Sequence, residues 1–166
     1  MKTAYNDIPN DGLVFIFQAN RNFSTDEAEV INQDIQQFSE VWLSHTKAVK
    51  NYAQIYFNRV IVFFVDDAFN AVGGCSKDSL HQFIKSLGEK YNINFFDRMQ
   101  FLYWNADNQL CDFNFNEAEQ LIQNEVLTAD TLIVNHQVDT KATFENNVKI
   151  PLKLSYFSKF LMSYHN

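Results

Sequence analysis

Each of the three arginines in the sequence directly follows an Asn or Asp, at a point where we expect a strand to begin or end. The three pairs are Asn20-Arg21, Asn58-Arg59 and Asp97-Arg98. A guanidinium group binds carboxylate and phosphate in a fixed fork geometry, so three that converge form an anion site. We therefore expect Arg21, Arg59 and Arg98, with Asn20 and Asn58, to line a pocket for a small anion. The alternative is that each arginine pairs with a local carboxylate or remains in solvent.

A second candidate site begins at the end of an apolar run over residues 60–65. Asp66 and Asp67 follow this run, and Cys75 and Ser76 come soon after, behind two glycines. Acidic residues at the end of an apolar strand can organise Mg²⁺ around phosphates, which predicts a Mg²⁺-dependent enzyme that handles phosphates or nucleotides as a rival function. A phosphate-binding loop of the form G-x-x-x-x-G-K-[ST] is absent from the sequence.

Cys75 can be interpreted either as a reactive cysteine or as a structural residue. Cys75 lies near the start of an expected helix, where unpaired backbone N–H groups favour a thiolate. Nearby acidic residues oppose that charge, so the alternative is a small residue packed at the helix start. The only other cysteine is Cys111, and the two form neither a CxxC pair nor a zinc-ligand pattern. We predict no disulfide, no metal site and no cofactor.

Length and charge limit the possible classes of protein. The chain has 166 residues and few Gly or Pro, which predicts one continuous domain over residues 1–166 with a single core. A net charge of -7 repels phosphate backbones and anionic membranes, so neither nucleic acid nor a membrane is an expected partner. No apolar run is long enough to span a bilayer, and the first residues lack an apolar signal core. We therefore expect a cytoplasmic protein.

The pattern of apolar residues predicts the elements that position these candidate sites. Residues 13–18 read as a central strand, and Ser24 with Glu27 matches a capping box that begins a long helix ending near His45. Two β-rich runs over residues 51–57 and 60–65 have hairpin spacing, with Asn58 and Arg59 between them. A second helix starts near Ser76, and Gly88 is its expected stop. Further strands are expected over residues 98–104 and 109–113.

The order strand, helix, strand, strand, helix, strand is the split βαβ pattern of ferredoxin-like folds. We therefore expect an α+β protein with a ferredoxin-like βαββαβ core, an antiparallel sheet, and additional C-terminal helices and short strands. In such a core the three arginine-bearing strand ends lie at one end of the sheet. The additional pieces are a helix over residues 116–125, a strand over 131–134 and a terminal helix after Ser155, which we expect to cover an edge or face.

Five strings of the sequence resemble a family of small bacterial proteins that carry the label "ABC transporter ATPase". The strings are FIFQANR, YFNRVIVFFVDD, GGCSKDS, NFFDRMQF and DTLIVNHQVDTK. The match spans nearly the whole length, which implies a complete protein rather than a fragment of a transporter. The phosphate-binding loop and the transporter signature are both missing, so the resemblance implies no catalytic residues.

A weaker likeness concerns residues 116–135, which resemble the helix and strand of small GYF-like adaptor modules. It leaves open an interaction with a protein partner. The leading hypothesis is a non-catalytic binding or interaction protein with an arginine-lined pocket for a small anionic ligand. The alternatives are the Mg²⁺-dependent enzyme and a homo-oligomeric structural or adaptor protein whose aromatic C-terminal helix is the interface.

Overall fold

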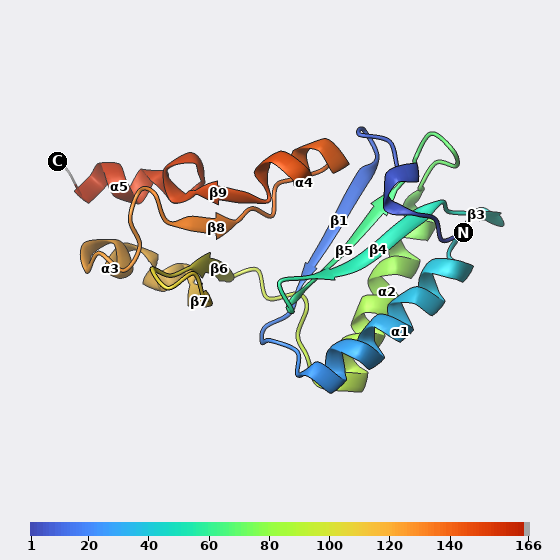
Figure 1. Cartoon of the computed structure of the whole chain (residues 1–166), viewed down its shortest axis with the longest axis horizontal. Helices are drawn as coiled ribbons and strands as arrows, with labels where there is room; N and C mark the ends of the chain where they lie inside the picture. The colour runs from blue at the N-terminus through green and yellow to red at the C-terminus, as the bar shows by residue number, and fades with distance from the viewer. Residues whose placement is uncertain (165–166) are drawn as a thin grey trace. The chain divides into compact units, whose positions relative to one another are not determined.

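The chain is a mixed α+β protein that forms two compact units (Figure 1). The computed structural model describes the backbone of residues 1–164 and the side chains of residues 1–161. Unit 1 consists of Met1–Asp97 and Asp139–Phe144, and unit 2 consists of Arg98–Val138 and Glu145–Asn166. Each unit has a hydrophobic cluster of its own, whereas the chain length predicts a single core.

The sheet of unit 1 has three antiparallel strands in the order β1-β5-β4. Their bounds are Leu13–Gln18 for β1, Asn51–Tyr56 for β4 and Val60–Val65 for β5. Every residue of β5 is buried because this strand is central and its two faces are both covered, as its uninterrupted apolar run predicts. Gln18 and Tyr56 both pair with Val60, so the end of β1 and the β4–β5 turn lie together at one end of the sheet.

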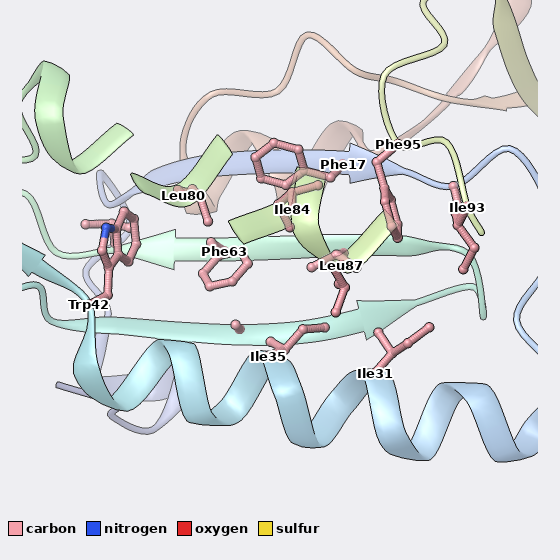
Figure 2. Packing of buried hydrophobic residues seen from close by; sticks show 14 of the residues in the cluster. Phe17, Ile31, Ile35, Trp42, Phe63, Leu80, Ile84, Leu87, Ile93 and Phe95 are labelled. Carbon is pink, nitrogen blue, oxygen red and sulfur yellow. The ribbon is translucent and has the colours of Figure 1, made fainter. Parts of the chain in front are cut away.

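Two helices cover one face of this sheet, α1 (Thr25–Val41) and α2 (Gly74–Tyr91). The predicted capping box is confirmed: Ser24 accepts a hydrogen bond from Glu27 N, and the Glu27 carboxylate accepts one from Ser24 N. Figure 2 shows the core between the helices and the strands. Its buried residues include Ile31, Ile35, Phe63, Leu80 and Ile84. On each helix these apolar residues are four positions apart, the spacing of one helix face.

The opposite face of the sheet is contacted by a segment that returns from much later in the chain. We call residues 139–144 the strap; they include the start of α4 (Lys141–Asn147). Its first residues pair with the edge of β1 and the chain before it, through backbone hydrogen bonds from Val14 N to Asp139 O at 2.9 Å, Lys141 N to Gly12 O at 2.8 Å and Ala142 N to Asn10 O at 2.9 Å. Phe144 packs edge-on against Phe64 and Tyr56, with ring centroids 5.0 and 4.9 Å apart. The strap thereby covers part of the face that the helices leave open.

Lys141 fixes the strap to the N-terminal segment. Its side chain is only 5% exposed, and its Nζ donates hydrogen bonds to the carbonyl oxygens of Tyr5 at 3.0 Å and Ile8 at 2.8 Å. The same ammonium group lies 4.1 Å from the centroid of the Tyr5 ring. A buried charge is costly unless polar groups surround it, and here two carbonyls and a π-face do so.

The predicted ferredoxin-like core is not confirmed, because the expected last strand pairs elsewhere. That strand is β6 (Gln100–Trp104), and it belongs to unit 2, where it pairs with β7 and β8 in a sheet of order β7-β6-β8-β9. The other elements of unit 2 are β7 (Leu110–Asn114), α3 (Ala118–Gln123), β8 (Leu132–Val134), β9 (Lys149–Pro151) and α5 (Ser158–Tyr164). A tight turn joins β6 to β7, so local pairing forms this hairpin in place of a long-range contact with β1.

The connection between α1 and β4 contains a short hairpin that the sequence did not indicate. It consists of β2 (Leu43–Ser44) and β3 (Lys47–Ala48), joined by His45 and Thr46 with φ angles of 50° and 68°. The expected helix to His45 therefore ends earlier, at Val41. Within residues 1–164, no helix is both long and apolar enough to cross a membrane.

Candidate functional site

A cavity of about 620 Å³ in unit 1 lies beside the C-terminal end of α2. We call it the α2-end cavity. Its lining residues include Asn20, Arg21, Lys85, Glu89, Asn94 and Phe96. Two of the five residues predicted to bind an anion, Asn20 and Arg21, therefore lie on one cavity wall, together with a lysine of α2.

The end of α2 shapes one side of this cavity. The sequence predicts that Gly88 ends the helix, but α2 continues to Tyr91, and Asn92 then adopts the left-handed conformation with φ of 55°. Ile93 N donates to Gly88 O at 2.9 Å, which turns the chain back along the helix. A Cβ atom on Gly88 would lie 2.5 Å from Ile93 O, so only glycine allows this close return.

Residues 92–96 are joined to the end of β1 by a reciprocal pair of hydrogen bonds. Asn20 N donates to Asn94 O at 2.9 Å, and Asn94 N donates to the Asn20 side-chain oxygen at 3.0 Å. The Asn94 side-chain oxygen accepts in turn from Phe96 N at 2.9 Å. Because its oxygen is used in this way, the Nδ2 group of Asn94 remains as a donor at the cavity.

Arg21 forms the other charged part of the wall, and it is already paired. Its two Nη atoms donate to the two carboxylate oxygens of Glu27, each at 2.8 Å, and Nη2 also donates to Tyr91 O at 3.0 Å. Arg21 thus joins the first turn of α1 to the last turn of α2, where acidic and basic groups respectively suit the helix dipoles. Its side chain is 41% exposed, so the guanidinium is still accessible from the cavity.

The pairing strongly favours the charged form of Glu27. The Arg21 guanidinium, with help from the backbone N–H of Ser24, lowers the pKa of Glu27 from 4.5 to about 2. The same hydrogen bond raises the pKa of Arg21. A group whose pKa is lower in the folded state stabilises the fold above its unfolded pKa and loses that contribution as the pH falls.

We expect Glu27→Gln to reduce the melting temperature at neutral pH and to have less effect in acid. Gln retains the capping bond to Ser24 N but cannot form the ion pair with Arg21. The difference from wild type is expected to narrow as the pH falls from 4.5 to about 2, the window between the unfolded and folded pKa values of Glu27. Melting curves across that range measure it, with the exposed acid of the same helix, Glu29→Gln, as the control. A difference that does not change with pH contradicts the role of the ion pair.

The other predicted anion-binding residues do not line this cavity. Arg59 is only 3% exposed, and its Nε donates to Ala19 O at 3.0 Å. Asn58 lies in the β4–β5 turn, where its Nδ2 donates to Phe23 O at 2.7 Å. Arg98 is exposed and belongs to unit 2. Arg21 and Arg59 thus lie at the same end of the unit 1 sheet, as predicted. Arg98 belongs to unit 2, so the three guanidinium groups do not line one pocket of unit 1.

The second candidate site is a loop held by its own carboxylates. Asp66 is paired with Lys50 at 3.2 Å and accepts a hydrogen bond from Phe69 N, and Asp67 accepts one from Val72 N at 2.8 Å. Through these bonds, both aspartates fix the chain between β5 and α2. Among the residues that the structure describes, no group of three or more His, Cys, Asp or Glu side chains is placed to hold a metal ion.

Cys75 and Ser76 lie in the first turn of α2 with different surroundings. Cys75 is exposed, whereas Ser76 is buried and its hydroxyl donates to Gly73 O at 2.8 Å. The carbonyl oxygen of Ser76 accepts a hydrogen bond from Trp42 Nε1 at 3.0 Å. Ser76 is thus part of the contact between α1 and α2, and Cys75 points away from the core.

The sequence pattern does not indicate Lys85, Asn92 or Asn94 as site residues. Lys85 looks like an ordinary solvent-facing residue of α2, and the two asparagines look like loop residues. The available signal was the stretch from Gly88 to Asn94, in which a glycine and two asparagines surround an expected helix end. The chain matches no protein-family model, no curated protein and no solved structure at a significant level.

Proposed function

We propose that the protein is a non-catalytic binding protein whose unit 1 holds a small anionic ligand in the α2-end cavity. The observation that carries the proposal is a set of hydrogen-bond donors without partners among the described residues. The donors are Lys85 Nζ and the side-chain amides of Asn92 and Asn94, which line the same cavity as Arg21. Donors of this kind bind carboxylate or phosphate oxygens, and bonds from a charged donor are the stronger ones.

The size and the mixed lining of the cavity support a small organic ligand. A volume of about 620 Å³ lies within the usual range of ligand pockets, about 300 to 1,000 Å³. Phe96 is 45% exposed and supplies apolar surface for the carbon part of a ligand. Glu89 lies one helical turn from Lys85 and adds an acceptor, which favours a ligand that carries a hydroxyl or amino group beside its anionic group.

The strand order of unit 1 supports a related proposal about the fold. β1-β5-β4 with α1 and α2 on one face has the order of the first three strands of a ferredoxin-like sheet. The α2-end cavity lies where such a sheet would continue after its second helix. We propose that unit 1 is a ferredoxin-like arrangement in which residues 92–96 take the place of the last strand.

A thermal-shift screen tests the binding proposal with phosphate, nucleotides, hydroxy acids and amino acids. A ligand present at about 100 times its Kd is expected to add about 2.7 kcal/mol to the free energy of unfolding. Lys85→Ala is expected to weaken this ligand about tenfold or more, because it removes a hydrogen bond from a charged donor. Lys77→Ala is the matched control, since Lys77 is an exposed lysine of the same helix outside the cavity.

Two results contradict the proposal. One is that none of these anions stabilises the protein. The other is that Lys77→Ala weakens the ligand as much as Lys85→Ala does, because the effect then reflects the general charge of α2 and not the cavity.

A further inference from the structure

A second pocket of unit 1, of about 460 Å³, lies between α1 and α2, and we call it the α1–α2 groove. Residues from both helices line it at helical spacing. The main contributors are Asp34, Phe38 and Val41 from α1, and Phe83, Ser86 and Lys90 from α2. Because the contributors follow i, i+4, i+7 on α1 and i, i+3, i+7 on α2, the groove runs along both helices. Two such ridges with a depression between them are the surface into which a third helix packs.

The floor of the groove is apolar and accessible. The rings of Phe38 and Phe83 stack face to face, with centroids 4.3 Å apart and an interplanar angle of 7°. Both rings pack against the core of unit 1 yet remain partly exposed. Val41 at one end of the groove is 67% exposed. This floor offers large side chains to the apolar face of a partner.

α1, the helix on one side of the groove, is strongly acidic. α1 carries five acidic residues and no Lys or Arg over its whole length, from Thr25 to Val41. At the other end of the groove, Lys90 Nζ and the Tyr91 hydroxyl both donate to Asp34, at 2.8 and 2.7 Å. This network fixes the end of the groove and pairs the two charged residues of its lining, Asp34 and Lys90, with each other. Glu27 is also paired, with Arg21, so the negative field along α1 comes from Asp26, Glu29 and Glu40. This field attracts a basic partner and repels an acidic one.

We infer that the α1–α2 groove docks a basic amphipathic helix of a partner protein. The apolar side chains of that helix lie on Phe38, Phe83 and Val41, and its Lys or Arg side chains face the acids of α1. Helix-in-groove recognition of this kind uses anchors at i, i+3, i+4 and i+7. A second copy of this chain fits less well, because two molecules that each carry a net charge of -7 repel one another.

The full-length protein and a labelled synthetic helix test this inference. The probe peptide has leucine at the i, i+3, i+4 and i+7 positions and lysine elsewhere, and its counterpart has glutamate in place of lysine. Fluorescence anisotropy is expected to show binding of the lysine peptide, weakened by added salt, and no binding of the glutamate peptide. Equal binding of both peptides overturns the inference.

A matched pair of variants tests whether the peptide binds in the groove or is only attracted by the overall charge of the protein. Val41→Lys places a cation and removes an apolar anchor in the groove, and it is expected to raise the Kd of the lysine peptide about tenfold or more. Val126→Lys changes the net charge equally but at an exposed valine of unit 2, and it is expected to change the Kd by less than about twofold. Equal effects of the two variants overturn the inference. So does light scattering that shows a dimer which Val41→Lys dissociates, since the occupant is then a second copy.

Discussion

Trp42→Ala is expected to reduce the free energy of unfolding by about 3 to 5 kcal/mol, the usual cost of truncating a fully buried tryptophan. The indole is 2% exposed and lies edge-on to Phe63, with ring centroids 5.8 Å apart. Its Nε1 donates to Ser76 O at 3.0 Å and to Ser79 Oγ at 3.1 Å. Trp42 therefore fills the core and also holds the end of α1 to the start of α2. Its loss affects the helix pair that forms the α1–α2 groove.

Two further variants separate these two roles of Trp42. Their free energies of unfolding are measured by urea unfolding followed by circular dichroism. Trp42→Phe retains an aromatic ring but removes the N–H donor, and it is expected to cost about 1 kcal/mol, because Ser76 O still accepts from the Ser79 hydroxyl. Val41→Ala, at the exposed neighbouring position, is expected to change stability by no more than about 0.5 kcal/mol. A loss of less than about 1 kcal/mol for Trp42→Ala shows that the indole is not part of the core.

Phe144→Ala is expected to reduce the free energy of unfolding by a similar amount, about 3 to 5 kcal/mol. Phe144 has this effect although it lies far along the chain from the sheet that it covers. Phe144 is 5% exposed and contacts the rings of Phe64 and Tyr56. Truncation leaves a cavity over the face of β5 that the helices do not reach. The strap then loses its largest apolar contact and retains its backbone bonds and Lys141.

The control for this variant is Phe69→Ala, since Phe69 belongs to the same unit and is 56% exposed. We expect it to cost about 0.5 kcal/mol or less. If the two variants unfold at the same urea concentration, Phe144 does not cover the sheet. Far-ultraviolet circular dichroism of both variants before unfolding checks that their secondary structure is unchanged.

Most elements of unit 1 can be predicted from the sequence because their patterns are strong and local. β1 and β5 are short apolar runs bounded by polar residues, and α1 has a capping box followed by apolar residues along one face. The β4–β5 hairpin was also predicted, but its turn is centred on Phe57 and Asn58, with φ angles of 56° and 55°. A phenylalanine rarely adopts a positive φ, so the sequence points to Asn58 and Arg59 instead.

Long-range features could not be predicted in this way. The role of β6 depends on whether it pairs with β1 or with β7, and its own sequence pattern does not specify the partner; in the structure it pairs with β7. The arginine prediction located Arg21 and Arg59 at the correct end of the sheet. The sequence does not indicate that Arg59 is buried. Nor does it indicate that the Glu27 carboxylate accepts hydrogen bonds from both Ser24 N and Arg21. Those outcomes depend on three-dimensional distances between residues that only the folded chain defines.

The strap has a consequence for how unit 1 is made. Its sheet is complete only when residues 139–144 return to β1, and the whole of 98–138 is synthesised between Asp97 and that return. Closing so long a loop is slow compared with forming the β4–β5 hairpin. Tyr5 and Tyr52 contact Phe64 earlier, but a nascent chain leaves the part of this apolar face that Phe144 covers exposed until late in translation. Such a transiently exposed face is prone to aggregate and is the kind of surface that chaperones protect.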